Sequence, residues 1–260
     1  MNKEINIAEE LILNPSQFTI IAGPCAVESY EQMECIAKFL KKLGIKYLRG
    51  GVFKPRTDPK SFQGLGIEGL EILRAVKKIY KFKIVSEIMD PRDIDLAYDC
   101  VDIYQVGSRN MQNYSLLKEM GKTDKPILLK RGMSATIEEW IKASEYIALE
   151  GNENIILCER GIRTFETYTR NTLDLMSIPI LKSKTNYPIF VDPSHGTGRR
   201  ELVLPATKAA LVLGASGIIV EIHPKPEQAL SDGAQSLNFA QFENLVRELN
   251  LLKNSIYEKE

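Results

Sequence analysis

The sequence is poor in several features that mark particular classes of protein. Its 260 residues include one tryptophan, two histidines and four cysteines, which lie far apart without a CxxC pair: Cys25, Cys35, Cys100 and Cys158. This spacing indicates neither a disulfide framework nor a zinc-ribbon site, and it favours a reducing compartment. The 34 Lys and Arg residues are balanced by 34 Asp and Glu residues. Without a surplus of cations, the chain is not expected to bind nucleic acid or an anionic membrane.

Long hydrophobic runs are also missing. The longest apolar stretches, such as 202–213, are interrupted by Pro, Thr or Lys well before they reach the roughly 20 residues that span a bilayer. The first residues, MNKEINIAEELILNPSQ, carry acidic side chains where a secretory signal has an apolar run. We therefore expect no transmembrane helix, and we expect the protein to be cytoplasmic.

What the sequence does contain is a regular alternation of short β-rich runs with longer amphipathic segments. The runs predict eight strands, at 18–25, 47–53, 83–89, 102–108, 126–132, 154–161, 188–195 and 217–224. Helix start signals lie between them: Ser29, Pro91 at a first helical position, and Thr136 in a capping box with Glu139. The alternation predicts an α/β fold, a (β/α)₈ TIM barrel. Residues 1–17 are expected to form a short N-terminal extension, and residues 18–260 a single catalytic barrel.

Polar residues occupy the C-terminal end of every predicted strand. Counting back by twos, the period of a strand, gives mostly apolar inward positions such as Ile21, Val85 and Val191, with Gln105 as the exception. The last inward positions are all polar: Cys25, Arg49, Glu87, Arg109, Lys130, Arg160, His195 and Glu221. Enzymes with this fold carry the active site at this end of the barrel. The pattern therefore predicts a catalytic layer above packed apolar layers.

A first group of candidate site residues has the chemistry of metal ligands. It combines a thiol, an imidazole and two carboxylates, from Cys25, His195, Glu221 and Asp232. Such a set suits a divalent ion of borderline softness, such as Mn, Fe, Co, Zn or Cu, and it converges only if the barrel closes. Taken singly, Cys25 could also be a small buried hydrophobic residue, His195 a polar turn residue, and Asp232 a turn or helix-cap residue. His223, one step further along the last strand, is a weaker candidate for supporting the site.

A second group is cationic. It contains Arg49, Lys54, Arg56, Arg109, Lys130, Arg131 and Arg160, with Arg199 or Arg200 as further candidates. So many positive groups in one pocket would repel one another unless anions bind there. Phosphate is the natural anion for arginine and lysine, and the neighbouring glycines permit a close approach of the backbone to a ligand. The group predicts a site for two phosphates, or for a phosphate and a carboxylate on each of two substrates.

Eight segments together resemble one enzyme family: IAGPCAVES, RGGVFKPRTDPKSFQGLG, SEIMDPRD, QVGSRNMQNY, LLKRGM, CERGIRTFE, VDPSHGTGRRELV and VEIHPKPEQALSDGAQSL. They are similar to 3-deoxy-D-arabino-heptulosonate 7-phosphate (DAHP) synthases of the type I beta group, which also contains the 3-deoxy-octulosonate 8-phosphate synthases. The resemblance runs from about Phe18 to Leu237. It implies a TIM barrel, commonly a homotetramer. It also implies a transferase that condenses phosphoenolpyruvate, erythrose 4-phosphate and water to DAHP and phosphate. That reaction is the first step of the shikimate pathway to chorismate and the aromatic amino acids.

The resemblance also implies roles for individual residues. One divalent metal ion per subunit would be held by Cys25, His195, Glu221 and Asp232. Phosphoenolpyruvate would be bound by Arg49, Lys54, Arg109, Lys130 and Arg160, and the sugar phosphate by Arg56 and Thr57. Lys54 and Lys130 would manage protons, and Glu87 would orient water or a cationic neighbour. Some relatives carry ferredoxin-like or chorismate-mutase segments. Because this sequence has none, we expect no separate allosteric domain and little inhibition by phenylalanine, tyrosine or tryptophan.

Three other functions remain open at this point. A 3-deoxy-8-phosphooctulonate synthase would share the barrel and chemistry but use arabinose 5-phosphate. A Schiff-base aldolase would use Lys130 as an amine activated by Arg131. A barrel that only binds phosphate or stores metal would not turn over. The segment from Lys54 to Thr57 favours erythrose 4-phosphate, because octulosonate synthases typically carry Ala-Asn-Arg-Ser-Ser after the lysine, whereas Pro55 restricts this loop.

Overall fold

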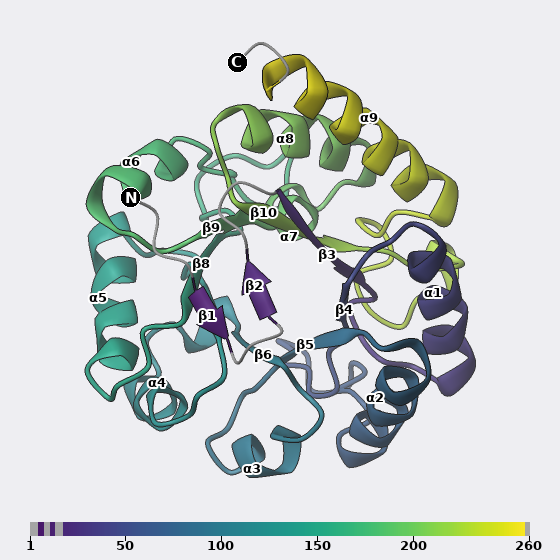
Figure 1. The fold of residues 1–260 in the computed structure, drawn as a ribbon, viewed down its shortest axis with the longest axis horizontal. Helices are drawn as coiled ribbons and strands as arrows, with labels where there is room; N and C mark the ends of the chain where they lie inside the picture. Colours follow the sequence, from purple (N-terminus) through teal and green to yellow (C-terminus); the bar gives the residue numbers. More distant parts are fainter. Residues whose placement is uncertain (1–4, 8–10, 14–17, 258–260) are drawn as a thin grey trace.

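Eight parallel strands close into a barrel in the computed structural model of the chain, which describes residues 5–7, 11–13 and 18–257 (Figure 1). The strands are β3 (Thr19–Gly23), β4 (Tyr47–Arg49), β5 (Lys83–Glu87), β6 (Ile103–Val106), β7 (Ile127–Lys130), β8 (Ile155–Glu159), β9 (Ile189–Val191) and β10 (Gly217–Glu221). They follow one another in chain order around the barrel, and β10 pairs with β3 to close it. The predicted fold class is confirmed.

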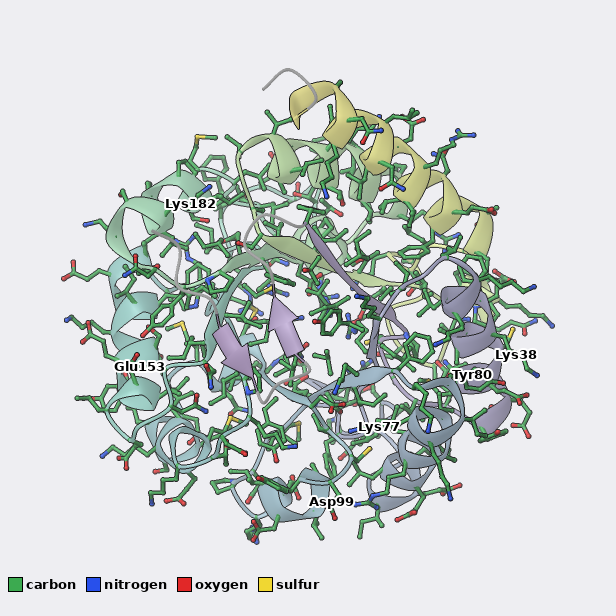
Figure 2. The ribbon with its side chains drawn as sticks, in the orientation of Figure 1. Lys38, Lys77, Tyr80, Asp99, Glu153 and Lys182 are labelled. Carbon is green, nitrogen blue, oxygen red and sulfur yellow. The ribbon has the colours of Figure 1, made fainter. Side chains whose placement is uncertain are left out.

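Helices surround the barrel in the ring seen in Figure 1. They are α1 (Tyr30–Lys42), α2 (Ile67–Tyr80), α3 (Asp93–Ala97), α4 (Tyr114–Gly121), α5 (Ile137–Ala148), α6 (Ser177–Lys184), α8 (Arg200–Val212) and α9 (Phe239–Tyr257). The short helix α7 (Pro193–Thr197) and the 3₁₀ turns η1 (Ser108–Asn110) and η2 (Pro226–Gln228) belong to connections after strands. Charged side chains such as Lys38, Asp99, Glu153 and Lys182 lie on the periphery (Figure 2).

Two of the predicted helix starts are confirmed, and one is misplaced. Ser29 is the N-cap of α1 and accepts from the backbone N–H of Gln32, and Thr136 forms the capping box with Glu139 at α5. Pro91, in contrast, precedes α3 by two residues. It lies in a turn in which the backbone N–H of Ile94 donates to its carbonyl at 3.2 Å, so the chain begins to turn at Pro91 but becomes helical later.

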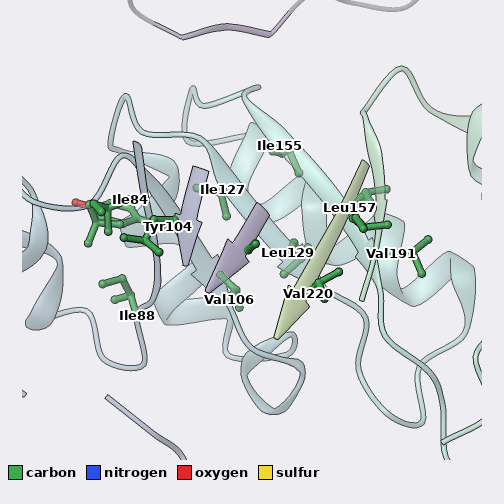
Figure 3. Close-up of a cluster of buried hydrophobic side chains, with 14 of the residues drawn as sticks. Ile84, Ile88, Tyr104, Val106, Ile127, Leu129, Ile155, Leu157, Val191 and Val220 are labelled. Carbon is green, nitrogen blue, oxygen red and sulfur yellow. The ribbon is translucent and has the colours of Figure 1, made fainter. Parts of the chain in front are cut away.

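The buried residues form two layers. Eight side chains fill the inside of the barrel: Ile21, Val85, Ile103, Leu128, Ile156, Cys158, Phe190 and Ile219. A larger cluster, part of which is drawn in Figure 3, packs between the strands and the helices. The prediction that Val191 faces inward is wrong, since Val191 belongs to the outer cluster and Phe190 to the inner one. Because strand side chains alternate, the next inward position after Phe190 is Asp192.

Near the N-terminus, β1 (Ile5–Ile7) pairs antiparallel with β2 (Leu11–Leu13). In Figure 1 this hairpin is drawn across the end of the barrel that faces the viewer. The rest of the predicted extension lies outside the described residues, so the boundary between 1–17 and 18–260 stays a prediction. Of the described helices, none is long and apolar enough to cross a membrane.

Candidate active site

A cavity of about 290 Å³ is lined by residues that end or follow the barrel strands. All of the predicted substrate-binding residues line it: Arg49, Lys54, Arg56, Thr57, Arg109, Lys130 and Arg160. Glu87, His195 and Asp232 line the same cavity. The structure therefore brings together side chains that are up to 183 positions apart in the sequence, from Arg49 to Asp232. Their roles in binding and catalysis stay predictions.

The four candidate metal ligands converge at one side of this cavity. Each offers a ligand atom, and these atoms all lie within 4.8 Å of one another. The Cys25 thiol lies 3.2 Å from Asp232 Oδ2. His195 Nε2 lies 3.4 Å from Glu221 Oε1 and 3.5 Å from Asp232 Oδ2. The closure of β10 against β3 makes this possible, because it sets the loop after β3 beside the last residue of β10.

The environment of these ligands fits a cation. Glu221 Oε1 is buried and lies 3.1 Å from Arg49 Nη1 in an ion pair, but it accepts no hydrogen bond within the described part of the chain, whereas Glu221 Oε2 accepts from Gln235 at 2.6 Å. Burial lowers the pKa of His195, but the negative charges of Asp192 and Glu221 outweigh it and raise that pKa to about 10. The protonated imidazole thus supplies positive charge among the carboxylates. A divalent ion bound by the same atoms would supply more.

Asp192 is a central residue that the sequence reasoning missed. Its side chain is fully buried, and its Oδ2 accepts from Lys130 Nζ at 2.5 Å and from His195 Nδ1 at 2.7 Å. Its Oδ1 caps α7 by accepting from the backbone N–H of His195 at 2.9 Å. A register shifted by one residue in β9 would have revealed it, because Asp192 then becomes the polar inward position of that strand. His195 lies beyond the strand, in α7.

Three cations of the cavity are paired with carboxylates, Arg49 with Glu221, Lys130 with Asp192 and Arg170 with Asp232, whereas Arg160 and Lys54 form no ion pair among the described residues. Arg160 is buried, and its guanidinium donates only to the Gly161 carbonyl, at 3.2 Å, among the hydrogen bonds of the described residues. Burial lowers the pKa of Arg160 and the neighbouring Arg170 lowers it further, against the opposing effect of Asp192. Burial also lowers the pKa of Lys54, but electrostatic interactions with Cys25 and Glu87 raise it above its usual value. Lys54 is therefore held as an ammonium, and both residues favour a bound anion.

Arg170 is a second residue that the sequence did not reveal. It comes from the long connection between β8 and α6, lines the cavity, and lies 3.1 Å from Asp232 Oδ1. Its Nη1 also donates to Gln235 at 2.9 Å. No strand pattern marks this connection, so the sequence offered no signal that would place Arg170 at the site.

Some of the candidates do not reach the cavity. Arg131 pairs with Glu159 at 2.9 Å and with Asp174 at 2.8 Å, because neighbouring residues of an extended chain point to opposite faces. Arg199 pairs with Glu201, and Arg200 donates to the Gly233 carbonyl at 2.8 Å. His223 bonds to Glu28 at 3.3 Å and accepts from the backbone N–H of Lys225.

Ser231 joins the metal group to the expected sugar-phosphate anchor. Arg56 Nη1 donates to Ser231 Oγ at 2.6 Å, and the same oxygen lies 3.1 Å from the Cys25 sulfur. Thr57 Oγ1 in turn accepts from Arg109 at 3.3 Å. The loop after β4 therefore contacts both the metal group and the loop after β6.

Comparison with known proteins agrees with this geometry. Residues 4–257 match the model of the DAHP synthetase I family. The chain belongs to this family. The phospho-2-dehydro-3-deoxyheptonate aldolase of Thermotoga maritima is 54% identical over 239 residues, which cover 92% of this chain and 71% of the relative. A 2-dehydro-3-deoxyphosphooctonate aldolase of Francisella philomiragia is 32% identical over 273 residues, covering 96% of this chain and 98% of the relative.

Solved structures of the family have the same fold. A crystal structure of the Thermotoga maritima DAHP synthase superposes with a TM-score of 0.94 at 51% identity, covering 98% of this chain and 74% of that one. A truncated form of the 3-deoxy-D-arabino-heptulosonate 7-phosphate synthase from the same organism gives a TM-score of 0.91 at 47% identity, with coverages of 98% and 93%. The barrel described above is thus the family fold.

Proposed function

We propose that the chain is a 3-deoxy-7-phosphoheptulonate synthase, a transferase that condenses phosphoenolpyruvate with erythrose 4-phosphate and water to give DAHP and phosphate. One observation carries the proposal: a single cavity combines a four-residue metal group with cations suited to two phosphorylated substrates. The family membership and the 54% identity to a relative of this activity support it. The reaction would be the first step toward chorismate and the aromatic amino acids.

Phosphoenolpyruvate occupies the deeper part of the cavity in this proposal. Arg49, Lys54, Lys130 and Arg160 are each at least 92% buried, so their charges act in a medium that screens them weakly. Arg160 and the more exposed Arg109 hold the phosphate and stabilise it as it leaves. Lys54 and Lys130 are ammonium donors that can hold the carboxylate or deliver a proton to an oxygen of the substrate.

The metal group of Cys25, His195, Glu221 and Asp232 would hold one divalent ion of the Mn, Fe, Co, Zn or Cu type. When bound there, the ion would act as a Lewis acid toward the aldehyde oxygen of erythrose 4-phosphate. Glu87 lines the same cavity as Lys54, and its Oε2 accepts from Gln105 at 3.4 Å. Its negative charge stabilises the ammonium of Lys54, which supports a role in orienting water or that lysine.

Arg56 and Thr57 bind the phosphate of the aldose in this proposal. Arg56 donates one of its five N–H groups to Ser231 beside the metal group, so the others can bind a phosphate at the far end of a four-carbon chain. Pro55 limits how far that loop extends. A five-carbon aldose phosphate would be misplaced at one end, and a misplacement of about 1 Å can cost on the order of a hundredfold in rate.

The deciding experiment compares kcat/KM for erythrose 4-phosphate and arabinose 5-phosphate at saturating phosphoenolpyruvate and fixed metal. We expect a preference for erythrose 4-phosphate on the order of a hundredfold. Equal values, or a preference for arabinose 5-phosphate, would assign the chain to the octulosonate branch of its relatives.

The Schiff-base alternative loses its structural basis. It required Arg131 beside Lys130, but Arg131 pairs with Glu159 and Asp174, and Lys130 is paired with Asp192. Borohydride trapping of a substrate on Lys130 is therefore expected to fail, while chelator-sensitive release of phosphate distinguishes the enzyme from a barrel that only binds. A homotetramer is proposed on the family resemblance, and sedimentation of the purified protein tests it.

A further inference from the structure

We propose that Asp192 is a positioning residue that sets both the metal ligand His195 and the substrate-binding Lys130 through one carboxylate oxygen. The inference rests on the proposed function for the identity of the two ligands, a divalent metal and phosphoenolpyruvate. It adds a residue that neither the sequence pattern nor the predicted ligand set contains.

Both carboxylate oxygens of Asp192 have fixed hydrogen-bond donors in the protein. The side chain is fully buried, so water does not compete for its oxygens. Oδ1 accepts from the backbone N–H of His195, at 2.9 Å. Oδ2 faces two further nitrogens, Lys130 Nζ at 2.5 Å and His195 Nδ1 at 2.7 Å. An ionised carboxylate only accepts hydrogen bonds, so Nδ1 must carry a hydrogen.

This arrangement fixes which ring nitrogen of His195 is available to a metal. With the hydrogen on Nδ1, the lone pair of a neutral imidazole is on Nε2, the atom that faces Glu221 and Asp232. A carboxylate behind a histidine ligand also fixes the orientation of the ring and makes it a better donor. Asp192 therefore selects both the tautomer and the direction of the ligand.

The same oxygen of Asp192 orients Lys130 in the part of the cavity proposed to bind phosphoenolpyruvate. Lys130 is the last residue of β7, 4% exposed, and its side chain crosses the barrel top to reach Asp192 beyond β9. A buried ammonium with a single carboxylate partner keeps donors for an anion in the cavity. Because one oxygen of Asp192 accepts from both Lys130 and His195, a change at Asp192 is expected to weaken the binding of both the metal and phosphoenolpyruvate.

Substitution of Asp192 by asparagine tests whether Lys130 and His195 depend on this carboxylate, because both of its oxygens face hydrogen-bond donors. In Asp192→Asn, an NH₂ group must replace one of them. If it replaces Oδ2, it opposes Lys130 and drives the His195 hydrogen to Nε2. If it replaces Oδ1, it opposes the backbone N–H that α7 needs capped. Asp192→Ser separates these effects, since serine is a good N-cap but is too short to serve Lys130 and Nδ1 as well.

Thr197→Val is the matched control. Thr197 lies in the same helix and donates to the Pro193 carbonyl at 2.8 Å, so the change removes a buried hydrogen bond of α7 without touching His195 or Lys130. Circular dichroism and thermal melting establish that each variant is folded before any binding is measured.

The test titrates metal-free wild type and the three variants with Co²⁺ alone, following the visible d–d and thiolate charge-transfer bands, and separately with phosphoenolpyruvate. We expect both Asp192 variants to weaken Co²⁺ binding by about 10–100-fold with altered bands, and to weaken phosphoenolpyruvate binding as well. Thr197→Val should stay within about twofold of the wild type in both titrations, as expected for a site outside the ligand contacts.

A folded Asp192→Ser protein with wild-type Co²⁺ affinity and spectrum would overturn the inference. So would a loss confined to one ligand, or an equal loss in Thr197→Val. Neither titration uses an aldose phosphate, so these results do not decide the reaction. A wild-type protein that binds both probes but does not consume phosphoenolpyruvate with either aldose would instead refute the proposed function.

Discussion

Lys130 and Arg131 are neighbours in the chain, yet they belong to two buried charge clusters of different character. The inner cluster, around Lys130 and Asp192, joins the cavity and contains a second buried ion pair, Arg49 Nη1 and Glu221 Oε1, whose atoms lie 3.1 Å apart but make no hydrogen bond among the described residues. In the outer cluster, Arg131 bonds to Glu159, Asp174 and the Ala135 carbonyl, and Glu159 also accepts from the Gly161 backbone. Cations and acids satisfy one another in the outer cluster. The inner cluster leaves bonding capacity for ligands.

Breaking the outer cluster should affect stability and spare chemistry. Arg131→Met would leave the fully buried Glu159 carboxylate without its main partner, which typically costs ~3–5 kcal/mol in the free energy of unfolding. Urea denaturation measures this loss, and kcat/KM of the folded protein should remain close to the wild-type value. Lys130→Met is the contrasting variant, with turnover lost and a smaller change in stability. Equal effects of the two variants on turnover would remove the distinction between the clusters.

Removing a metal ligand from the inner cluster should reduce metal affinity and turnover, whereas breaking the outer cluster reduces stability. Cys25→Ala deletes one of four ligands, and the neighbouring Ala22 and Ala26 offer no replacement. If the ligands share the roughly 10–16 kcal/mol of a structural zinc site equally, the loss is about 3 kcal/mol, or on the order of a hundredfold in metal affinity. Chelation of the wild type should abolish turnover. Cys35→Ala changes an exposed cysteine and serves as the control; full activity of metal-free wild type would contradict the prediction.

The pH dependence of metal binding tests whether His195 in the inner cluster is protonated before a metal binds. The pKa of His195 is raised to about 10 in the metal-free site, so below that pH a metal must displace a proton from Nε2. Metal affinity should therefore rise with pH, at least about tenfold per unit between pH 6.5 and 9, and fall as the pH is lowered. Calorimetry in buffers of different ionisation enthalpy counts the released protons. An affinity that is flat from pH 7 to 9 would show that His195 holds no proton there.

The sequence predicted the parts of the site that follow from strand periodicity and from the resemblance. Counting by twos correctly placed the last residues of four strands on the inner face of the barrel: Arg49, Glu87, Lys130 and Glu221. The same count failed in β9, because that strand ends at Val191 and His195 belongs to a separate helix. An inward register through Phe190 would have identified Asp192.

Strand periodicity could not predict the contacts between loops. Arg170 and Ser231 come from connections without a repeating pattern, and their places depend on how loops after different strands pack together. Arg131 was misassigned although strand alternation places it on the face opposite Lys130; its acidic partners Glu159 and Asp174 are 28 and 43 positions away in sequence and gave no local signal. Only the folded chain brings a buried charge to its partner across such distances.

The pairing of β10 with β3 has a consequence for how the protein is made. The metal group draws on residues from 25 to 232, so it cannot exist until the last strand has closed against the first. A nascent chain with seven strands offers scattered single ligands, whereas the finished barrel offers four at once. A divalent ion held as proposed would therefore bind at the end of folding. Because an ion that binds only the closed state also stabilises that state, the proposed metal would stabilise the closed barrel against opening between β10 and β3.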